Sequence, residues 1–399
     1  RSSDRPAHLA EDCVMTRFLL YSHDTYGLGH FRRCCLVASG LASLDRRNEA
    51  LIVTGSPLAQ SAQLPSGVDT VKLPTATKDR SGAYRPRKLH GSINRLIELR
   101  GELIRSVFSS YAPDVILVDN SPLGMGGELG SMLRDVSRTT RRPRLVLGLR
   151  DIVDAADRVD WVWHRDGVWE ALAAYDEILV YGDARVETTA TELGIGRRVD
   201  ATVTHTGFVA PSMPERSTND QFVLVTPGGG GDGQRLLRRY LDAVEAGATA
   251  HVRSIVVTGP LMAAGRRAEL LDRAEHLPSV RLVESSDQMR SLIASATAVV
   301  SMAGYNTVVE EMAAGTPSLL VPRCHPRVEQ HIRSVRLAAV SETLHHCPIE
   351  ELSPTRIGGF IADALDAPRW PCALDLDGVG SVARRLSGSS RPTRAPSYA

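Results

Sequence analysis

The segment Ser301-Met-Ala-Gly-Tyr-Asn-Thr-Val-Val-Glu-Glu-Met-Ala-Ala-Gly-Thr-Pro-Ser-Leu-Leu-Val-Pro322 predicts the fold more clearly than any other part of the chain. It predicts the end of a strand, a tight turn, a short helix that stops at Gly315, and a second strand. In the turn, Gly304 lets the backbone approach a ligand closely. The N–H groups at the start of the helix attract phosphate, because that end carries a partial positive charge. The segment therefore predicts a pocket for a phosphorylated ligand on an α/β fold.

An acid, Glu310, follows the turn, and we expect it on the first turn of the helix. Its carboxylate can accept hydrogen bonds from two ribose hydroxyls. As an alternative, Thr307-Val-Val-Glu310 fits a capping box, in which Glu310 only satisfies backbone donors. The surrounding segment favours the ribose interpretation.

The same alternation of short apolar runs and amphipathic stretches continues through most of the chain. Strands are expected at 17–22, 51–54, 70–73, 115–118, 144–149, 177–181 and 201–206, then at 222–226, 254–258, 280–284, 297–301 and 318–321. Runs of this kind suit strands that are buried on both faces of a parallel sheet. The pattern predicts an α/β fold of two doubly wound, Rossmann-like domains that face a central cleft.

The division into domains follows from one stretch without periodicity. We expect an N-terminal domain over 14–208, a linker over 209–220, a C-terminal domain over 221–387 and a disordered tail over 388–399.

The bulk composition narrows the class of protein. The 399 residues carry a net charge of +1, which gives no sign of a nucleic-acid partner. No apolar run approaches the roughly 20 residues of a membrane span. Residues 1–12 lack an apolar signal core, and the six cysteines form no CxxC pair. We therefore expect a cytoplasmic protein with reduced thiols and no bound metal or cofactor.

A glycine-rich loop opens the second half. Gly228, Gly230 and Gly233 formally satisfy G-x-G-x-x-G, a dinucleotide fingerprint. That fingerprint also needs an acid after the next strand, and the run 257–260 has none. We interpret the loop as one that approaches phosphate, the alternative being a merely flexible loop.

Polar residues at the strand ends of the first half would face the same cleft. The turn after residues 17–22 carries two base candidates, Asp24 and His30, which suit deprotonation of a sugar acceptor; His30 alternatively only braces the turn. We assign four residues to the acceptor side of the cleft: Gly29, Asp119, Arg150 and Asp151. Alternatively, Asp119 caps a helix and Arg150 pairs with Asp151.

Together, the Gly-His turn at 27–30, the loop at 228–233 and the 301–322 segment resemble GT-B glycosyltransferases, most closely their family-28, MurG-like branch. The resemblance implies an acceptor-binding first domain and a second domain that binds a nucleotide-sugar donor, most often a UDP-sugar, without a metal. It implies these donor residues: Gly229, Gly230 and Gly231 near the phosphates, Val283 at the base, Gly304, Asn306 and Thr307 at the diphosphate, Glu310 at the ribose, and Glu329 with Gln330 at the sugar.

The resemblance implies an inverting glycosyltransferase that acts on a natural-product or cell-envelope hydroxyl. In this chain Glu329 stands where the family has Gln, so the donor sugar is left open. Weak peripheral contact with a membrane is also left open, since only the loop 77–90 is strongly basic. The alternatives are a nucleotide-sugar 2-epimerase of the same architecture and a non-catalytic nucleotide-binding protein.

Overall fold

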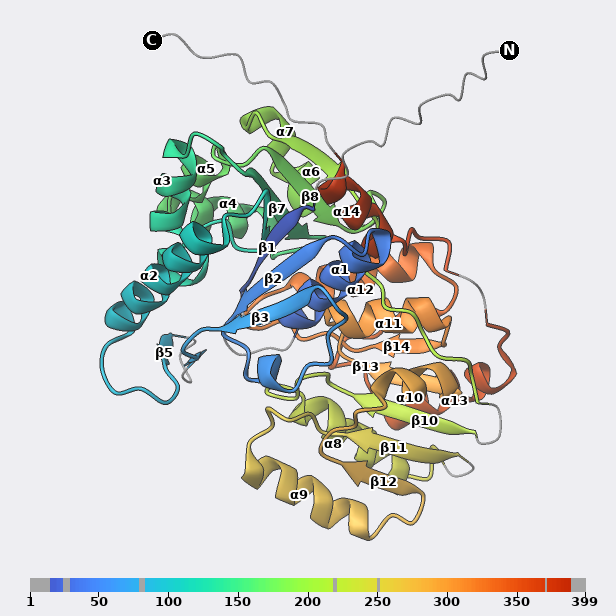
Figure 1. Ribbon diagram of the computed structural model, residues 1–399. Helices are drawn as coiled ribbons and strands as arrows, with labels where there is room; N and C mark the ends of the chain where they lie inside the picture. The colour runs from blue at the N-terminus through green and yellow to red at the C-terminus, as the bar shows by residue number, and fades with distance from the viewer. Residues whose placement is uncertain are drawn as a thin grey trace, which may run out of the picture.

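Two parallel sheets, one in each half of the chain, organise the molecule (Figure 1). The computed structural model describes residues 15–23, 29–78, 83–217, 221–249, 252–369 and 372–388. Asp24, one of the two base candidates, lies outside these residues. No helix among the described residues is long and apolar enough to cross a bilayer.

The N-terminal sheet has the strand order β3-β2-β1-β6-β7-β8-β9. Its strands are β1 (Arg17–Ser22), β2 (Glu49–Thr54), β3 (Val68–Lys72), β6 (Val115–Asp119), β7 (Arg144–Arg150), β8 (Glu177–Tyr181) and β9 (Thr202–His205). The helices and 3-10 turns of this half are α1 (Gly29–Leu44), η1 (Pro57–Gln60), α2 (Ile93–Tyr111), η2 (Met125–Gly127), α3 (Gly130–Arg138), α4 (Ala156–Arg165), α5 (Val168–Leu172), α6 (Thr189–Glu192) and α7 (Ile195–Arg198). Every residue of β6 and β8 is buried, because helices cover both faces of the sheet.

The C-terminal sheet has the order β12-β11-β10-β13-β14-β15. Its strands are β10 (Phe222–Thr226), β11 (Arg253–Val257), β12 (Val280–Val283), β13 (Ala298–Ser301), β14 (Ser318–Leu320) and β15 (Leu344–His346). Its helices are α8 (Gln234–Glu245), α9 (Ala264–Glu275), α10 (Met289–Ser295), α11 (Tyr305–Ala314), α12 (Glu329–Val340) and α13 (Pro354–Asp366). The expected α/β architecture of two doubly wound domains is confirmed.

Three strands were not expected from the sequence. β15 is a sixth strand of the C-terminal sheet, and β4 (Ala76–Lys78) pairs antiparallel with β5 (Tyr84–Pro86) inside the basic loop. Only Leu344 of β15 is buried, so its sequence carries almost no strand signal.

The last helix, α14 (Gly378–Ser387), returns to the N-terminal domain, although the sequence division placed it with the C-terminal one. Its apolar face joins the same core cluster as the residues of α1, and an added Cβ on Gly40 of α1 would lie 2.8 Å from Val379 (Figure 1). The segment before α14 is held there too, since Phe208 N donates to Asp375 O at 2.8 Å. The apolar face of α14 packs against α1, which is distant in sequence, so a local sequence pattern does not reveal this contact.

A buried ion pair joins the two domains. The Arg333 guanidinium of α12 donates to both carboxylate oxygens of Asp151, each at 2.8 Å, and both side chains are at most 1% exposed. Arg333 also donates to the carbonyl oxygens of Ala303 and Ile152, at 3.0 and 3.1 Å. A buried charge is tolerated only with such partners, so the pair ties α12 to the strand ends of the N-terminal sheet.

A buried acid lies in α11, beside the predicted ribose acid. Glu311 is 0% exposed, and burial raises the pKa of its carboxyl to about 8, with Ser301 lowering it and Glu310 raising it to smaller extents. Glu311 is therefore protonated in the folded chain at neutral pH.

Replacing Arg333 by Met should destabilise the fold by about 3–5 kcal/mol, because Asp151 is left as a buried charge without its partner. Urea unfolding followed by tryptophan fluorescence measures the loss. In the double variant Arg333→Met/Asp151→Asn, where neither charge is present, part of the stability should return. A single variant as stable as the wild type would show that the pair does not hold the domains together.

The raised pKa of Glu311 should make the stability of the protein depend on pH. The pKa of Glu311 in the folded chain is about 8, above the ordinary 4.5. The stability that the neutral carboxyl contributes is therefore fully present below pH 4.5 and is lost as the pH rises through 8. Over that window the loss is up to about 1.4 kcal/mol per pH unit. Glu311→Gln keeps the shape and cannot ionise, so its stability relative to the wild type should grow from pH 5 to pH 8. A constant difference across that range would refute the buried neutral acid.

Candidate functional site

The two predicted turns meet at the domain interface. Gly29 is the first residue of α1, and its carbonyl oxygen accepts a hydrogen bond from Asn306 Nδ2 at 3.3 Å. An added Cβ at Gly29 would lie 3.0 Å from that nitrogen, so the contact favours glycine there. The acceptor-side turn and the donor-side turn, 277 residues apart in sequence, are thus in direct contact.

His30 and Asp119 form a dyad beside this contact. His30 Nδ1 lies 2.5 Å from Asp119 Oδ2, with the His30 side chain 20% exposed and the Asp119 side chain 1% exposed. Arg33 donates to both oxygens of Asp119 at 2.8 Å. The interpretation that Asp119 caps a helix is therefore wrong. Its carboxylate orients the imidazole, which leaves the second ring nitrogen of His30 for a substrate.

The charge of Asp119 is fixed by its neighbours. Burial alone would raise the pKa of this carboxyl, but Arg33 and then His30 outweigh burial and hold the pKa well below its usual range. Arg33 itself lies over the rings of Tyr181 and Tyr305, 5.4 and 5.2 Å from their centroids. The ionised Asp119 carboxylate lies against one ring nitrogen of His30 at 2.5 Å and so holds the imidazole in one orientation, as a general base requires.

Helix α11 starts at Tyr305 after Gly304, and no described side chain caps it. Glu310 lies on the second turn of α11, so its expected place on the first turn is wrong. No capping box forms, because no hydrogen bond ties the Glu310 carboxylate to a backbone nitrogen in the described chain. The backbone nitrogens at the helix start are therefore not covered by a side chain.

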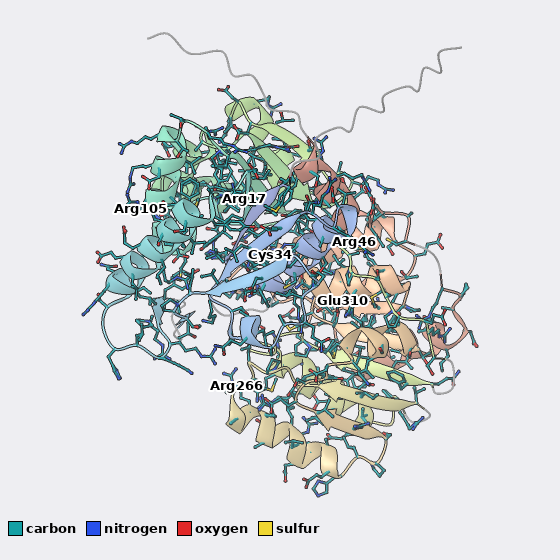
Figure 2. All side chains as sticks on the ribbon, in the orientation of Figure 1. Arg17, Cys34, Arg46, Arg105, Arg266 and Glu310 are labelled. Atoms are coloured by element: carbon teal, nitrogen blue, oxygen red, sulfur yellow. The ribbon has the colours of Figure 1, made fainter. Side chains whose placement is uncertain are left out.

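Glu310, labelled in Figure 2, is half-buried. Burial raises its pKa, while the charges of Arg32 on α1 and Arg290 on α10 lower it. The acid thus lies within electrostatic reach of helices from both domains, close to the helix start that carries the predicted diphosphate residues Asn306 and Thr307.

The glycine-rich loop faces the same helix start. Gly228 has φ of 74°, and a Cβ there would lie 3.4 Å from Thr307 Oγ1. Gly230 has φ of 89°, and a Cβ there would come within 2.1 Å of Thr258 O. Gly229 O accepts from Leu261 N at 2.9 Å, so the loop containing Gly229, Gly230 and Gly231 packs against the turn after β11. The alternative of a merely flexible loop does not fit this packing.

Val283 ends β12, and its carbonyl oxygen accepts from Thr258 N at 2.9 Å. It therefore lies beside the turn after β11, against which the glycine-rich loop packs, and this is where a base-binding backbone segment is expected.

The start of α12 faces the N-terminal domain. Glu329 is 5% exposed and accepts a hydrogen bond from Arg323, while Gln330 Oε1 accepts from Arg323 N at 3.2 Å. Burial would raise the pKa of Glu329, but Arg323, Arg150, Arg333 and Arg327 together lower it. The predicted sugar-reading acid is therefore a carboxylate set among arginines.

Arg150 and Asp151 do not pair with each other, so the predicted local ion pair is wrong. Asp151 pairs with Arg333, whereas Arg150 Nε donates to Asn120 Oδ1 at 3.2 Å. Both residues nevertheless lie at the interface, as their strand-end position predicts.

Sequence reasoning missed the arginines that organise the site. Arg33 follows His30 by three residues on α1, and Arg333 follows Glu329 by four residues on α12. Residues at these spacings share a helix face, so the spacing could have flagged both arginines.

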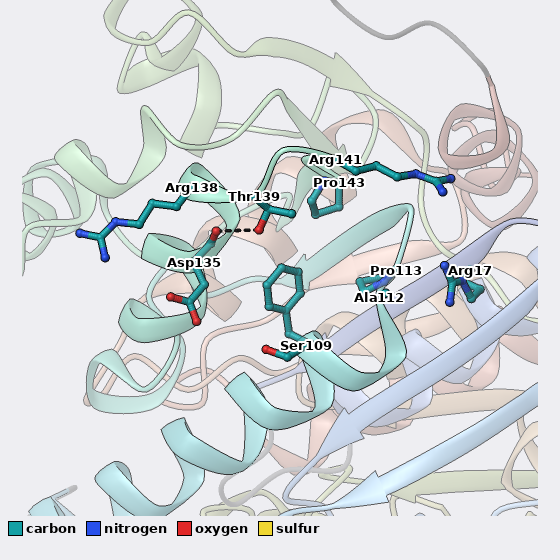
Figure 3. Close-up of a pocket in the computed structure, with 10 residues that line it drawn as sticks. Arg17, Ser109, Ala112, Pro113, Asp135, Arg138, Thr139, Arg141 and Pro143 are labelled. Carbon is teal, nitrogen blue, oxygen red and sulfur yellow. Dashed lines mark hydrogen bonds between the residues drawn. The ribbon is translucent and has the colours of Figure 1, made fainter.

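A separate cavity of about 470 Å³ lies at the opposite end of the N-terminal sheet (Figure 3). It is lined by residues at the amino ends of the strands, including Arg17, Pro113 and Pro143, and by Asp135 and Arg138 of α3. None of the predicted site residues lines it, and the carboxyl ends of the strands point away from it.

Comparisons with known proteins indicate the same two-domain fold. Residues 222–344 match the glycosyltransferase family 28 C-terminal domain. The search of curated proteins found no match.

Among solved structures, TcCGT1 in complex with UDP has a TM-score of 0.61 and 14% identity, over 94% of each chain. MurG of Acinetobacter baumannii has a TM-score of 0.55 and 11% identity, over 94% of this chain and 96% of that one. The glycosyltransferase VinC in complex with dTDP has a TM-score of 0.56 and 17% identity, over 93% and 96%. The chain therefore has the GT-B fold, and its residues 222–344 are similar to the glycosyltransferase family 28 C-terminal domain.

Proposed function

We propose that this chain is an inverting glycosyltransferase, which moves a sugar from a nucleotide-sugar donor to a hydroxyl of a natural-product or cell-envelope acceptor. One observation carries the proposal most: the His30–Asp119 dyad, at 2.5 Å, lies next to the Gly29–Asn306 contact at the start of α11. A base and a phosphate-attracting helix start are thereby brought together across the domain interface.

In the proposed reaction, the acceptor hydroxyl attacks the anomeric carbon of the donor. The hydroxyl proton passes to His30, whose imidazole is held in place by the Asp119 carboxylate. The bond between the anomeric carbon and the diphosphate breaks, and the nucleoside diphosphate leaves with the bonding electron pair. Attack from the face opposite the leaving group inverts the anomeric centre.

The donor is proposed to lie along the C-terminal domain. Its diphosphate would lie at the uncapped start of α11 and against the loop 228–233, its ribose at Glu310, and its base at Val283. Glu329 and Gln330, at the start of α12, would contact the sugar. UDP is the first candidate nucleotide, since two structural neighbours were solved with UDP and one with dTDP. Backbone N–H groups and the arginines of the interface would stabilise the leaving diphosphate without a metal.

Replacing Glu310 by Ala should weaken UDP binding about ten- to a hundredfold, because hydrogen bonds from ribose hydroxyls to a carboxylate are lost. Isothermal titration calorimetry measures the affinity, and circular dichroism checks that the fold is kept. Glu275→Ala, which removes an exposed acid at the end of α9, is the matched control. Equal UDP affinity in Glu310→Ala and the wild type would argue against the ribose assignment.

Replacing His30 by Gln should lower the transfer rate about 10²–10⁴-fold, because the positioned base is lost, while UDP affinity stays within about twofold. The assay follows nucleotide release from UDP-sugars in the presence of an acceptor panel. His164→Gln, on the exposed face of α4, is the control.

Two outcomes contradict the proposal. If the His30→Gln variant kept the wild-type transfer rate, His30 would not be the general base. Formation of an epimeric nucleotide sugar without any acceptor, seen by NMR, would instead identify a 2-epimerase.

A further inference from the structure

Arg150, at the end of β7, is a cation of the domain interface left without a carboxylate. The neighbouring arginines are already matched in ion pairs: Arg33 with Asp119, Arg333 with Asp151, and Arg323 with Glu329. Within the described ranges, no carboxylate lies within ion-pair distance of Arg150. A guanidinium in such surroundings favours a negatively charged partner.

Asn120 holds Arg150 in one orientation. Its Oδ1 accepts from Arg150 Nε at 3.2 Å and from the Arg150 backbone nitrogen at 3.4 Å. Asn120 adopts φ of 64°, a left-handed conformation that asparagine tolerates better than most residues. Among the described residues Nε alone of the guanidinium donates a hydrogen bond, so its two terminal nitrogens form a planar fork, the geometry that binds carboxylate or phosphate with two hydrogen bonds.

The surroundings of Arg150 come from both domains. Burial, then Arg333 and Arg33, lower the pKa of its guanidinium to about 10, while Glu329 and Asp151 act in the opposite direction. Glu329 and Arg333 belong to α12, whose first turn is proposed to contact the donor sugar. Asp151, the next residue, pairs with Arg333 of α12 at 2.8 Å, so Arg150 lies beside the helix whose start is proposed to contact the donor sugar, although its sequence position assigns it to the acceptor side.

We propose that Arg150, oriented by Asn120, binds an anionic group of the donor, which is either the diphosphate or a carboxylate on the transferred sugar. The inference rests on the proposed nucleotide-sugar function and adds an N-terminal residue to donor recognition. The shared chemistry is an oxyanion with two oxygens that accept from the guanidinium fork.

Calorimetric titrations of UDP, UDP-glucose and UDP-glucuronate separate the two sources. Arg150→Met should lose about ten- to a hundredfold in affinity for the ligand that supplies the anion. An equal loss for all three ligands identifies the diphosphate, and a loss for UDP-glucuronate alone identifies a sugar carboxylate. Arg158→Met, which removes an exposed arginine that reaches Pro326 across the same interface, should bind all three like the wild type. If Arg150→Met also binds all three like the wild type, the inference is overturned.

Asn120→Asp gives an independent test, because it supplies Arg150 with the carboxylate that the chain otherwise withholds. This internal partner should compete with the ligand and lower its affinity at least tenfold, while the melting temperature of the ligand-free protein stays equal or rises. Arg150→Met should also keep the ligand-free melting temperature, since no ion pair is lost. Undiminished affinity in Asn120→Asp, or a large loss of melting temperature in both variants, would show a structural role instead.

Failure of this inference is distinguishable from failure of the proposed function. Wild-type protein that binds none of the three ligands contradicts the nucleotide-sugar function, and the inference falls with it. Wild-type binding that is weakened by Glu310→Ala but not by Arg150→Met keeps the function and overturns only the role of Arg150.

Discussion

The burial of charge at the domain interface is the constraint on which the rest of the structure depends. Arg333 and Asp151, both at most 1% exposed, can remain there only because each satisfies the other. Their pairing fixes α12 against the carboxyl ends of the N-terminal strands. Arg33 and Asp119 repeat the arrangement on the other side of the interface, and Asp119 in turn fixes His30. The pairing of buried charges thus holds the two domains together and also orients the proposed base.

The chemistry follows from what the interface brings together. The N-terminal domain contributes a histidine with an ionised carboxylate behind it, and the C-terminal domain contributes an uncapped helix start and a partly exposed acid. Neither half contains both parts, so the proposed activity needs the two domains in contact. The packing of α14 on α1 ties residues 378–387 to the N-terminal domain.

The sequence predicts elements and strand-end residues well, because both depend on local patterns. Apolar runs such as β6 and β10 are buried throughout, so their periodicity identifies them. Gly230 is required by a turn that its neighbours define, and His30 and Glu310 are marked by position within short motifs. Pairings over long separations are different: Asp119 lies 89 residues from His30, and Asp151 lies 182 residues from Arg333. Such partners depend on tertiary packing, so local reasoning offered a helix cap and a local ion pair instead. β15 was missed for the converse reason, since a short strand with one buried residue has no pattern to detect.

The central claim is that a nucleoside diphosphate lies against α11 at the interface. A crystal structure of the protein soaked with UDP tests it most directly. The account predicts ribose hydroxyls within hydrogen-bond distance of the Glu310 carboxylate and the diphosphate at the backbone nitrogens of residues 305–307, facing the loop 228–233. UDP bound elsewhere, with the Glu310 carboxylate turned onto main-chain nitrogens of its own helix, would contradict it.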